Sequence, residues 1–153
     1  MYRAIVARRV RRTWAELERR NSEPVLHQLA SRFEHSFAGE HALGGTRRTH
    51  RSQAAWFARL FRLLPDIRFT VRDVLVAGWP WRTRVVTVID VTLPSCPDYR
   101  NLVMQHLELR WGRITRVENL EDTQRLADLL DRLGAGGSPE ALAAPIADPI
   151  AAA

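Results

Sequence analysis

The chain has 153 residues, of which 46% are hydrophobic and 26% are charged, which suits one domain with a core and a ligand cavity. The formal net charge is +6, and all 23 basic residues are arginine. Arginine without lysine indicates a codon bias, and no reading motif accompanies it, so we expect no specific nucleic-acid partner. The single cysteine, Cys96, excludes an internal disulfide and favours the cytoplasm. No apolar run has the length of a membrane span and no signal peptide is visible, so we expect no membrane partner.

The N-terminal part shows two helix patterns and one strand pattern. Residues 5–21 are predicted to form a helix, because apolar residues recur at helical spacing. Its apolar stripe consists of Val6, Val10, Trp14 and Leu17. The arginine-rich stretch 8–12 surrounds this stripe, as a solvated helix face would. Pro24 fits the first turn of a short second helix, and strict alternation over residues 33–37 predicts a short strand.

The residue pattern in the middle of the chain predicts a long helix followed by a meander of strands. Residues 49–64 form the clearest helix, which ends before Pro65. Its apolar face consists of Trp56, Phe57, Leu60, Phe61 and Leu64. Residues 67–93 are extended, and the alternation slips at Arg72 and Asp73, as a β-bulge would produce. The turn at residues 78–81 carries Trp79 and Trp81, which belong either to hairpin packing or to a pocket mouth or dimer surface.

The last strands contain an unusual amide. Residues 101–111 and 114–120 are predicted to pair as a hairpin, and Gln105 shares a strand face with Val103, Leu107 and Leu109. An amide among apolar residues is either a hydrogen-bonded core residue or part of a pocket. Asp122 then caps a helix that is predicted to end at Gly134. Residues 134–153 form a Gly/Ala/Pro-rich tail without apolar periodicity, so we expect a domain over residues 1–133 and a disordered tail.

This order of elements predicts an α+β fold in which helices cover one face of a strongly bent antiparallel sheet. Four motifs, taken in order, resemble the nuclear transport factor two-like superfamily, whose members include ketosteroid isomerases and SnoaL-like polyketide cyclases. They are the glycine-containing loop 38–46, the stretch 64–74, the element 107–114 and the closing Asn-Leu-Glu-Asp at 119–122. The resemblance spans residues 5–133. It implies a cone-shaped α+β barrel, an apolar pocket and a homodimer formed through the sheet.

The resemblance also places candidate catalytic residues. In the ketosteroid isomerase branch the base position falls near His35, the oxyanion-binding tyrosine near Trp14 and the acid on Gln105, so all three differ from the isomerase pattern. His35 could still move a proton, because imidazole titrates near neutral pH. Gln105 could donate a hydrogen bond to an oxyanion, and Trp14 could form a wall of the pocket. Asn119 shares strand parity with Val117 and is the third catalytic candidate.

Further residues are candidates for ligand binding, each with an ordinary structural alternative. Trp56, Phe33, Phe37 and Leu107 are large apolar residues on the expected inner faces. Asp90 lies on the opposite strand face, where it is either a surface residue or brought to the cavity by the bend of the sheet. His41 is either a lid residue or an exposed loop histidine. The five histidines show no His-x-x-x-His pair, so we expect neither a metal nor another cofactor.

Three functional hypotheses follow. The first is a cofactor-free isomerase or polyketide-type cyclase that uses acid/base chemistry on a hydrophobic, carbonyl-bearing small molecule. The second is a non-catalytic ligand-binding or dimerisation module. The third is a relative of epoxide hydrolases, which need a carboxylate–arginine–carboxylate set that Asp90 and Arg110 do not assemble. A closed pocket larger than about 300 Å³ that contains His35 and Gln105 would favour the first, and a cavity filled by side chains would favour the second.

Overall fold

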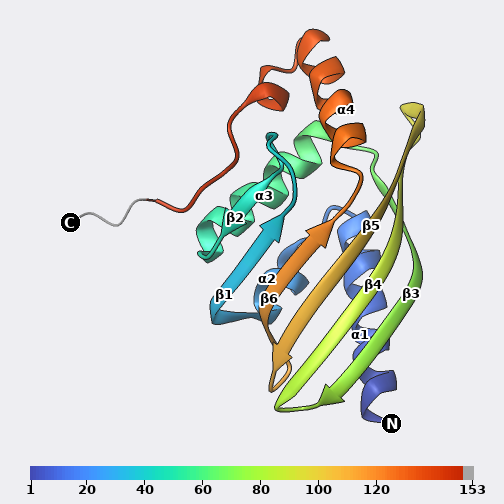
Figure 1. Cartoon of the computed structure of the whole chain (residues 1–153), viewed down its shortest axis with the longest axis vertical. Coiled ribbons are helices and arrows are strands. Elements are labelled where there is room, and N and C mark those ends of the chain that lie inside the picture. The colour runs from blue at the N-terminus through green and yellow to red at the C-terminus, as the bar shows by residue number, and fades with distance from the viewer. Residues whose placement is uncertain (150–153) are drawn as a thin grey trace.

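A computed structural model describes residues 1–149, which form four α-helices, one short 3-10 helix and a six-stranded sheet (Figure 1). The helical segments are α1 (Tyr2–Glu18), α2 (Glu23–Gln28), α3 (His50–Leu63), α4 (Thr123–Ala135) and η1 (Pro139–Leu142). The strands are β1 (Leu29–Phe37), β2 (Gly45–Arg47), β3 (Arg68–Trp79), β4 (Arg82–Leu93), β5 (Cys96–Arg110) and β6 (Arg113–Leu120). The predicted α+β class is therefore confirmed.

The sheet is bent and open, with the strand order β2-β1-β6-β5-β4-β3 (Figure 1). All neighbouring strands are antiparallel except β1 and β6, which run parallel, whereas a wholly antiparallel sheet was expected. The reason is topological: α3 carries the chain from β1 towards the far edge, and the four-stranded meander β3 to β6 returns to β1 in the same direction. The register between β3 and β4 shifts between Val71 and Asp73, so the predicted bulge is confirmed.

The helices α1, α2 and α3 cover the concave face of the sheet, and α4 lies across one end (Figure 1). The apolar stripe of α1 is buried as predicted, and Trp14 packs on Phe69 of β3 with ring centroids 5.0 Å apart. Trp56, Phe57 and Leu60 of α3 are buried. Two residues of this helix differ from the prediction. Phe61, which was expected on the buried face, is only half-buried, whereas Leu63, which was not expected there, is buried.

Side chains cap the N-terminal ends of α3 and α4. Thr49 Oγ1 accepts a hydrogen bond from the Ser52 amide at the start of α3, and Asp122 accepts one from the Arg125 amide at the start of α4. These contacts satisfy backbone donors that have no partner within the helix. Helix α4 continues to Ala135, one residue beyond the predicted end at Gly134.

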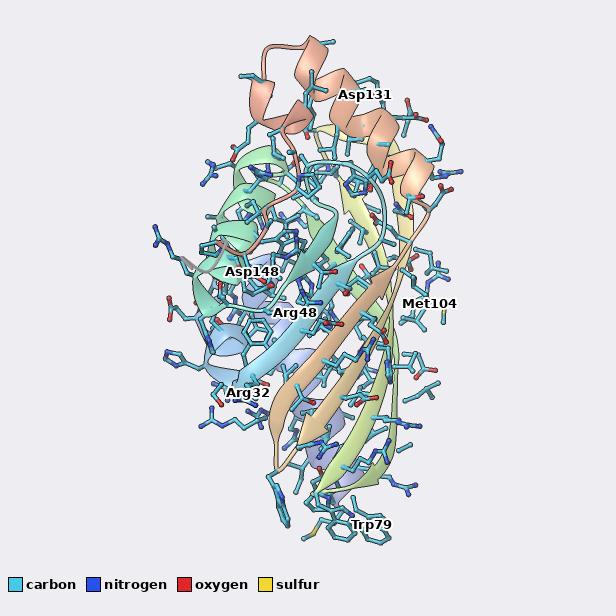
Figure 2. The ribbon with its side chains drawn as sticks, turned by 60° about the vertical axis from the view of Figure 1, so that its left-hand side comes forward. Arg32, Arg48, Trp79, Met104, Asp131 and Asp148 are labelled. Atoms are coloured by element: carbon cyan, nitrogen blue, oxygen red, sulfur yellow. The ribbon has the colours of Figure 1, made fainter. Side chains whose placement is uncertain are left out.

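The described part of the C-terminal tail is anchored, which differs from the expected disorder. Ala141 in η1 is buried, and Glu140 forms ion pairs with two arginines of α3. The Asp148 carboxylate accepts hydrogen bonds from the Arg48 amide at 2.9 Å and the Ser52 hydroxyl at 2.6 Å, as its position beside Arg48 in Figure 2 indicates. Polar anchors thus replace the missing apolar periodicity. The expectation for residues 150–153 lies outside the described residues.

We expect Asp148→Ala to lower the free energy of unfolding by about 1 kcal/mol, because it removes acceptors from the backbone amides at the start of α3. Urea unfolding followed by circular dichroism measures the change. Asp131→Ala serves as the control, because Asp131 lies on the exposed side of α4 (Figure 2). Equal unfolding midpoints for both variants would contradict an anchored tail.

Candidate functional site

A cavity of about 390 Å³ lies between the helices and the concave face of the sheet. Its wall is mostly apolar and is supplied by α1, α3, β5 and β6, and its size is in the range of small-molecule sites. Two exposed residues, Ile5 on α1 and Trp111 in the β5–β6 turn, also line it, so the cavity reaches the surface at this end. The sequence-based criterion was a closed pocket above about 300 Å³ with His35 and Gln105 in its wall; this cavity has the size and both residues but is open at one end.

A row of polar side chains crosses the apolar sheet face at the cavity. Gln105 on β5 pairs with Asn119 on β6, and the two amide groups are 2.9 Å apart. The second amide atom of Asn119 lies 2.8 Å from His35 Nε2 on β1. Arg47 on β2 is the register partner of His35, and its Nη2 lies 3.3 Å from His35 Nδ1. Four adjacent strands therefore contribute one side chain each to this polar row.

The polar row fixes the protonation of His35. A guanidinium can only donate, so Nδ1 of His35 accepts from Arg47. A neutral imidazole has one accepting nitrogen, so Nε2 carries the proton and donates it to the amide oxygen of Asn119. As placed, Asn119 turns its NH₂ to His35 Nε2 and accepts at Oδ1 from the Gln105 NH₂. Because two donors cannot face each other at Nε2, we assign nitrogen and oxygen of both amides the other way round, so that the Asn119 NH₂ donates to the Gln105 oxygen and the Gln105 NH₂ is left for the cavity.

Arg47 is fully buried without an acidic partner within 4 Å among residues 1–149. Its guanidinium donates to the carbonyl oxygens of Gly44 at 2.8 Å and Gly45 at 3.0 Å, and it lies 5.2 Å from the ring centre of Trp56. Burial lowers its pKa to about 10, so it remains a cation at neutral pH. Burial and the charge of Arg47 lower the pKa of His35 to about 3, so the imidazole is neutral.

A carboxyl group lies next to the polar row. Glu121 directly follows β6 and lines the cavity two residues beyond Asn119, a spacing of about 7 Å along an extended chain. Its Oε2 accepts from the Asn101 amide at 3.2 Å, whereas the buried Oε1 has no partner among the described residues. Burial, with a smaller contribution from the charge of Asp122, raises the pKa of Glu121 to about 8. The group is therefore mostly protonated at neutral pH.

The structure brings most of the sequence-predicted site residues to this one cavity. Its wall includes the three catalytic candidates and four of the ligand-binding candidates, His35, Gln105, Asn119, Trp14, Trp56, Phe37 and Leu107. Gln105 is half-buried rather than fully buried. The row also occupies both nitrogens of His35, so no ring nitrogen is free to take a proton from a ligand.

Three ligand-binding candidates lie elsewhere. Phe33 is buried but packs edge-on against the ring of His50, with centroids 5.2 Å apart. Asp90 is on the outer sheet face, where it pairs with Arg72, because the bend does not turn this face towards the cavity. His41 packs on the ring of Phe37 behind the cavity wall, and its pKa is lowered by burial.

Two residues of the site escaped the sequence-based prediction. Glu121 continues the inward alternation of Val117 and Asn119 and could have been found by extending that parity by one step. Arg47 sits in a glycine-rich loop whose strand, β2, is only three residues long, so no periodic signal marks its inward direction. Sequence reasoning identified the middle of the polar row but missed its charged end.

Residues 1–149 contain no group of three His, Cys, Asp or Glu side chains placed to hold a metal ion. In the same part of the chain, each helix is too short or too polar to cross a membrane.

Comparisons with known proteins agree with this architecture. Residues 10–117 match the model of the SnoaL-like domain, and the chain therefore belongs to the SnoaL-like family. The cone fold of this family and of the wider group of nuclear transport factor two-like proteins is thus confirmed. No curated protein matches the chain.

Solved structures share the fold at low sequence identity. One is a nuclear transport factor two-like protein of unknown function from Burkholderia pseudomallei, with 22% identity and a TM-score of 0.65 over 80% of this chain and 94% of that one. TerC, co-crystallised with polyporic acid, has 21% identity and a TM-score of 0.64 over 81% and 96%. PrhC from Penicillium brasilianum has 13% identity and a TM-score of 0.66 over 84% and 87%.

We expect Glu121→Gln to stabilise the protein at alkaline pH. Because the pKa of Glu121 is higher in the folded protein than its ordinary value, the bound proton stabilises the fold at low pH, and this contribution is lost as the pH rises through about 8. Glutamine keeps the shape of the protonated acid, so the variant should gain on the order of 4 kcal/mol over the wild type between pH 5 and pH 9. Urea unfolding at both pH values measures this difference.

Glu118→Gln is the matched control on the outer face. The hydrogen bond with His106 and the charge of Arg116 lower the pKa of Glu118, so its stabilising contribution is present above its ordinary pKa and is lost as the pH falls. The two variants should therefore change stability in opposite directions at alkaline pH. A Glu121→Gln variant whose stability follows that of the wild type at both pH values would contradict a protonated, buried carboxyl.

Proposed function

We propose that the protein binds a hydrophobic, carbonyl-bearing small molecule in this cavity and moves a proton on it, as an isomerase or a polyketide-type cyclase does. The observation that carries the proposal is that two polar groups line the same, mostly apolar cavity. They are the Gln105 amide at the end of the polar row and the Glu121 carboxyl with its raised pKa. Hydrogen bonds and charges interact more strongly with a ligand inside an apolar site, because water does not screen them there.

The chemistry needs two contacts with the ligand. The Gln105 NH₂ donates a hydrogen bond to the carbonyl oxygen, and the ionised form of Glu121 takes a proton from the adjacent carbon. The electron pair of the broken C–H bond moves onto the oxygen, and the carboxyl returns its proton to another atom of the same molecule. Protons and electrons therefore balance without an external oxidant or reductant. A pKa of about 8 makes Glu121 a stronger base than an ordinary carboxylate.

In this proposal His35 and Asn119 act through Gln105. The row holds the Gln105 amide with its donor towards the cavity, and the buried charge of Arg47 polarises the row in the direction that favours negative charge on the ligand oxygen. TerC, which shares the fold, was crystallised with polyporic acid, and this supports a small-molecule role for a cavity of the same architecture.

A second function, ligand binding without chemistry, is favoured by one observation. His35 stands where the resemblance places a catalytic base, and both of its ring nitrogens are engaged within the protein. A fully satisfied row is also what a binding site that only orients a carbonyl group would need.

We expect the proton-transfer rate to rise with pH and to level off above a midpoint near 8, because the ionised form of Glu121 is the base. The exchange of the α-protons of 2-tetralone in D₂O, followed by NMR, measures this rate without knowledge of the natural substrate. Glu121→Gln should lower the protein-dependent rate by about 10²–10⁴-fold and abolish the midpoint. Gln105→Leu should lower the rate while the midpoint remains.

His35→Asn distinguishes positioning from acid/base chemistry. It should lower the rate and leave the midpoint near 8, whereas a catalytic imidazole would give a midpoint that disappears with this variant. Melting temperatures within a few degrees of the wild type establish that each variant is folded. Binding of 2-tetralone without any acceleration of exchange would assign the cavity to ligand binding alone.

We further propose a homodimer formed through the outer sheet face and a cytoplasmic location, the latter because the one cysteine leaves no internal disulfide. The support for the dimer is a contiguous patch of exposed apolar residues, Leu102, Met104 and Leu120, on neighbouring strands. Figure 2 shows Met104 on the side of the sheet that faces away from the helices.

Met104→Glu should convert the dimer to a monomer, because a charge would be buried without a partner at the centre of the interface. Size-exclusion chromatography with light scattering measures the mass. Leu142→Glu introduces the same charge at an exposed residue of η1 and should leave the mass unchanged. A monomeric wild type would contradict this proposal.

A further inference from the structure

Three of the five tryptophans are exposed at one end of the molecule. Trp79, Trp81 and Trp111 are 61%, 55% and 74% exposed, and they come from the β3–β4 and β5–β6 turns. Trp79 and Trp81 stack with ring centroids 5.8 Å apart, and Trp81 lies 6.4 Å from Trp111. Figure 2 shows Trp79 at the tip of the molecule. With the exposed Ile5 of α1, these residues form what we call the tryptophan surface.

Hydrogen bonds connect the three segments that carry the tryptophan surface. The Trp111 amide donates to the Pro80 carbonyl at 2.7 Å and so joins the two turns. Arg9 of α1 donates to the Gly112 carbonyl at 3.2 Å, and the hydroxyls of Tyr2 and Thr83 are 2.5 Å apart. Figure 1 shows the N-terminus of α1 beside both turns. The surface is therefore held in shape by its own framework.

The charge around the tryptophan surface is mostly positive. Residues 1–15, 74–89 and 109–117, which build this end of the molecule, contain no aspartate or glutamate, and the adjacent acid, Glu108, forms an ion pair with its register partner Arg84. Eight exposed arginines in these segments form no ion pair within residues 1–149, and they are Arg3, Arg8, Arg9, Arg11, Arg12, Arg82, Arg110 and Arg113. The surface thus combines protruding indole rings with a rim of cations.

We propose that the tryptophan surface docks peripherally on an anionic lipid bilayer. Indole rings favour the boundary between headgroups and acyl chains, because one edge is polar and the body is apolar. Arginines near an anionic leaflet each add attraction of about 1 kcal/mol. The proposal differs from the sequence-based expectation of no membrane partner, which rested on the absence of a spanning segment.

The shape of the surface favours a bilayer over an acidic protein. The rings protrude from two turns, and protruding rings enter a soft layer of headgroups more readily than the flat, rigid surface of a folded partner. The cavity also reaches the surface here, because Ile5, Trp111 and Pro80 line it. On a bilayer the mouth of the cavity would face the lipid, so a hydrophobic ligand could enter the cavity without crossing water. Only this entry of a ligand rests on the proposed function.

Co-sedimentation of the full chain with sucrose-loaded vesicles tests the docking in the absence of any ligand, so its failure would leave the proposed function untouched. The wild type should bind vesicles of equimolar phosphatidylglycerol and phosphatidylcholine at low ionic strength and bind much more weakly at high salt or to phosphatidylcholine alone. Trp79→Ala combined with Trp81→Ala should weaken binding by about tenfold or more. Arg82→Gln combined with Arg113→Gln should weaken it by about tenfold or more as well.

Matched variants elsewhere separate docking from general effects. Arg100→Gln combined with Arg132→Gln removes the same charge outside the tryptophan surface, and Leu142→Ala removes an exposed apolar group from η1, outside both the tryptophan surface and the proposed dimer interface. Both control variants should bind as the wild type does. Equal loss in these control variants, or no binding to the anionic vesicles, would overturn the proposal. A change in tryptophan emission with soluble polyglutamate but not with vesicles would assign the surface to an acidic protein and would overturn it too.

Discussion

The arrangement of the site depends on one buried contact, in which the Arg47 guanidinium donates to Nδ1 of His35. Burying a cation without an acidic partner is costly, and the protein offsets this cost with the carbonyl oxygens of Gly44 and Gly45 and with the face of Trp56. Because Arg47 can only donate, His35 must accept at Nδ1 and carry its proton on Nε2. The orientation of the Asn119 amide follows from this proton, and the group that Gln105 presents to the cavity follows from the orientation of Asn119.

This dependence explains why a short edge strand and the C-terminal tail matter to the site. Strand β2 has three residues and brings Arg47 to His35 through their register pairing. The tail passes over the same region: the Ile146 carbonyl lies 3.5 Å from Arg47, and Asp148 holds the start of α3, which carries Trp56. The parallel pairing of β1 with β6 places His35 beside Asn119. The cavity wall is therefore set by elements from every part of the described chain.

Much of the fold follows from the sequence because its signals are periodic. The stripe from Val6 to Leu17, the bulge at Arg72 and the inward parity of Gln105 and Asn119 each need only local alternation or helical spacing. The parallel pairing of β1 with β6 depends on how distant segments assemble, so no local pattern predicts it. Arg47 and the anchored tail rely on single polar contacts instead of repeated apolar ones. The placement of Asp90 depended on how far the sheet bends, which periodicity does not specify, and His41 lies in a loop that has no periodicity.

The central claim is that Arg47 holds His35 as a neutral imidazole with its proton on Nε2. Heteronuclear NMR of protein labelled with ¹⁵N in its histidine rings measures this directly, with His35→Asn to assign the signal. The account predicts a protonated Nε2 and an unprotonated Nδ1 for His35, with no titration between pH 5 and pH 9, because the pKa of this ring is lowered to about 3. A proton on Nδ1, or a His35 ring that titrates near pH 6.5, would contradict it.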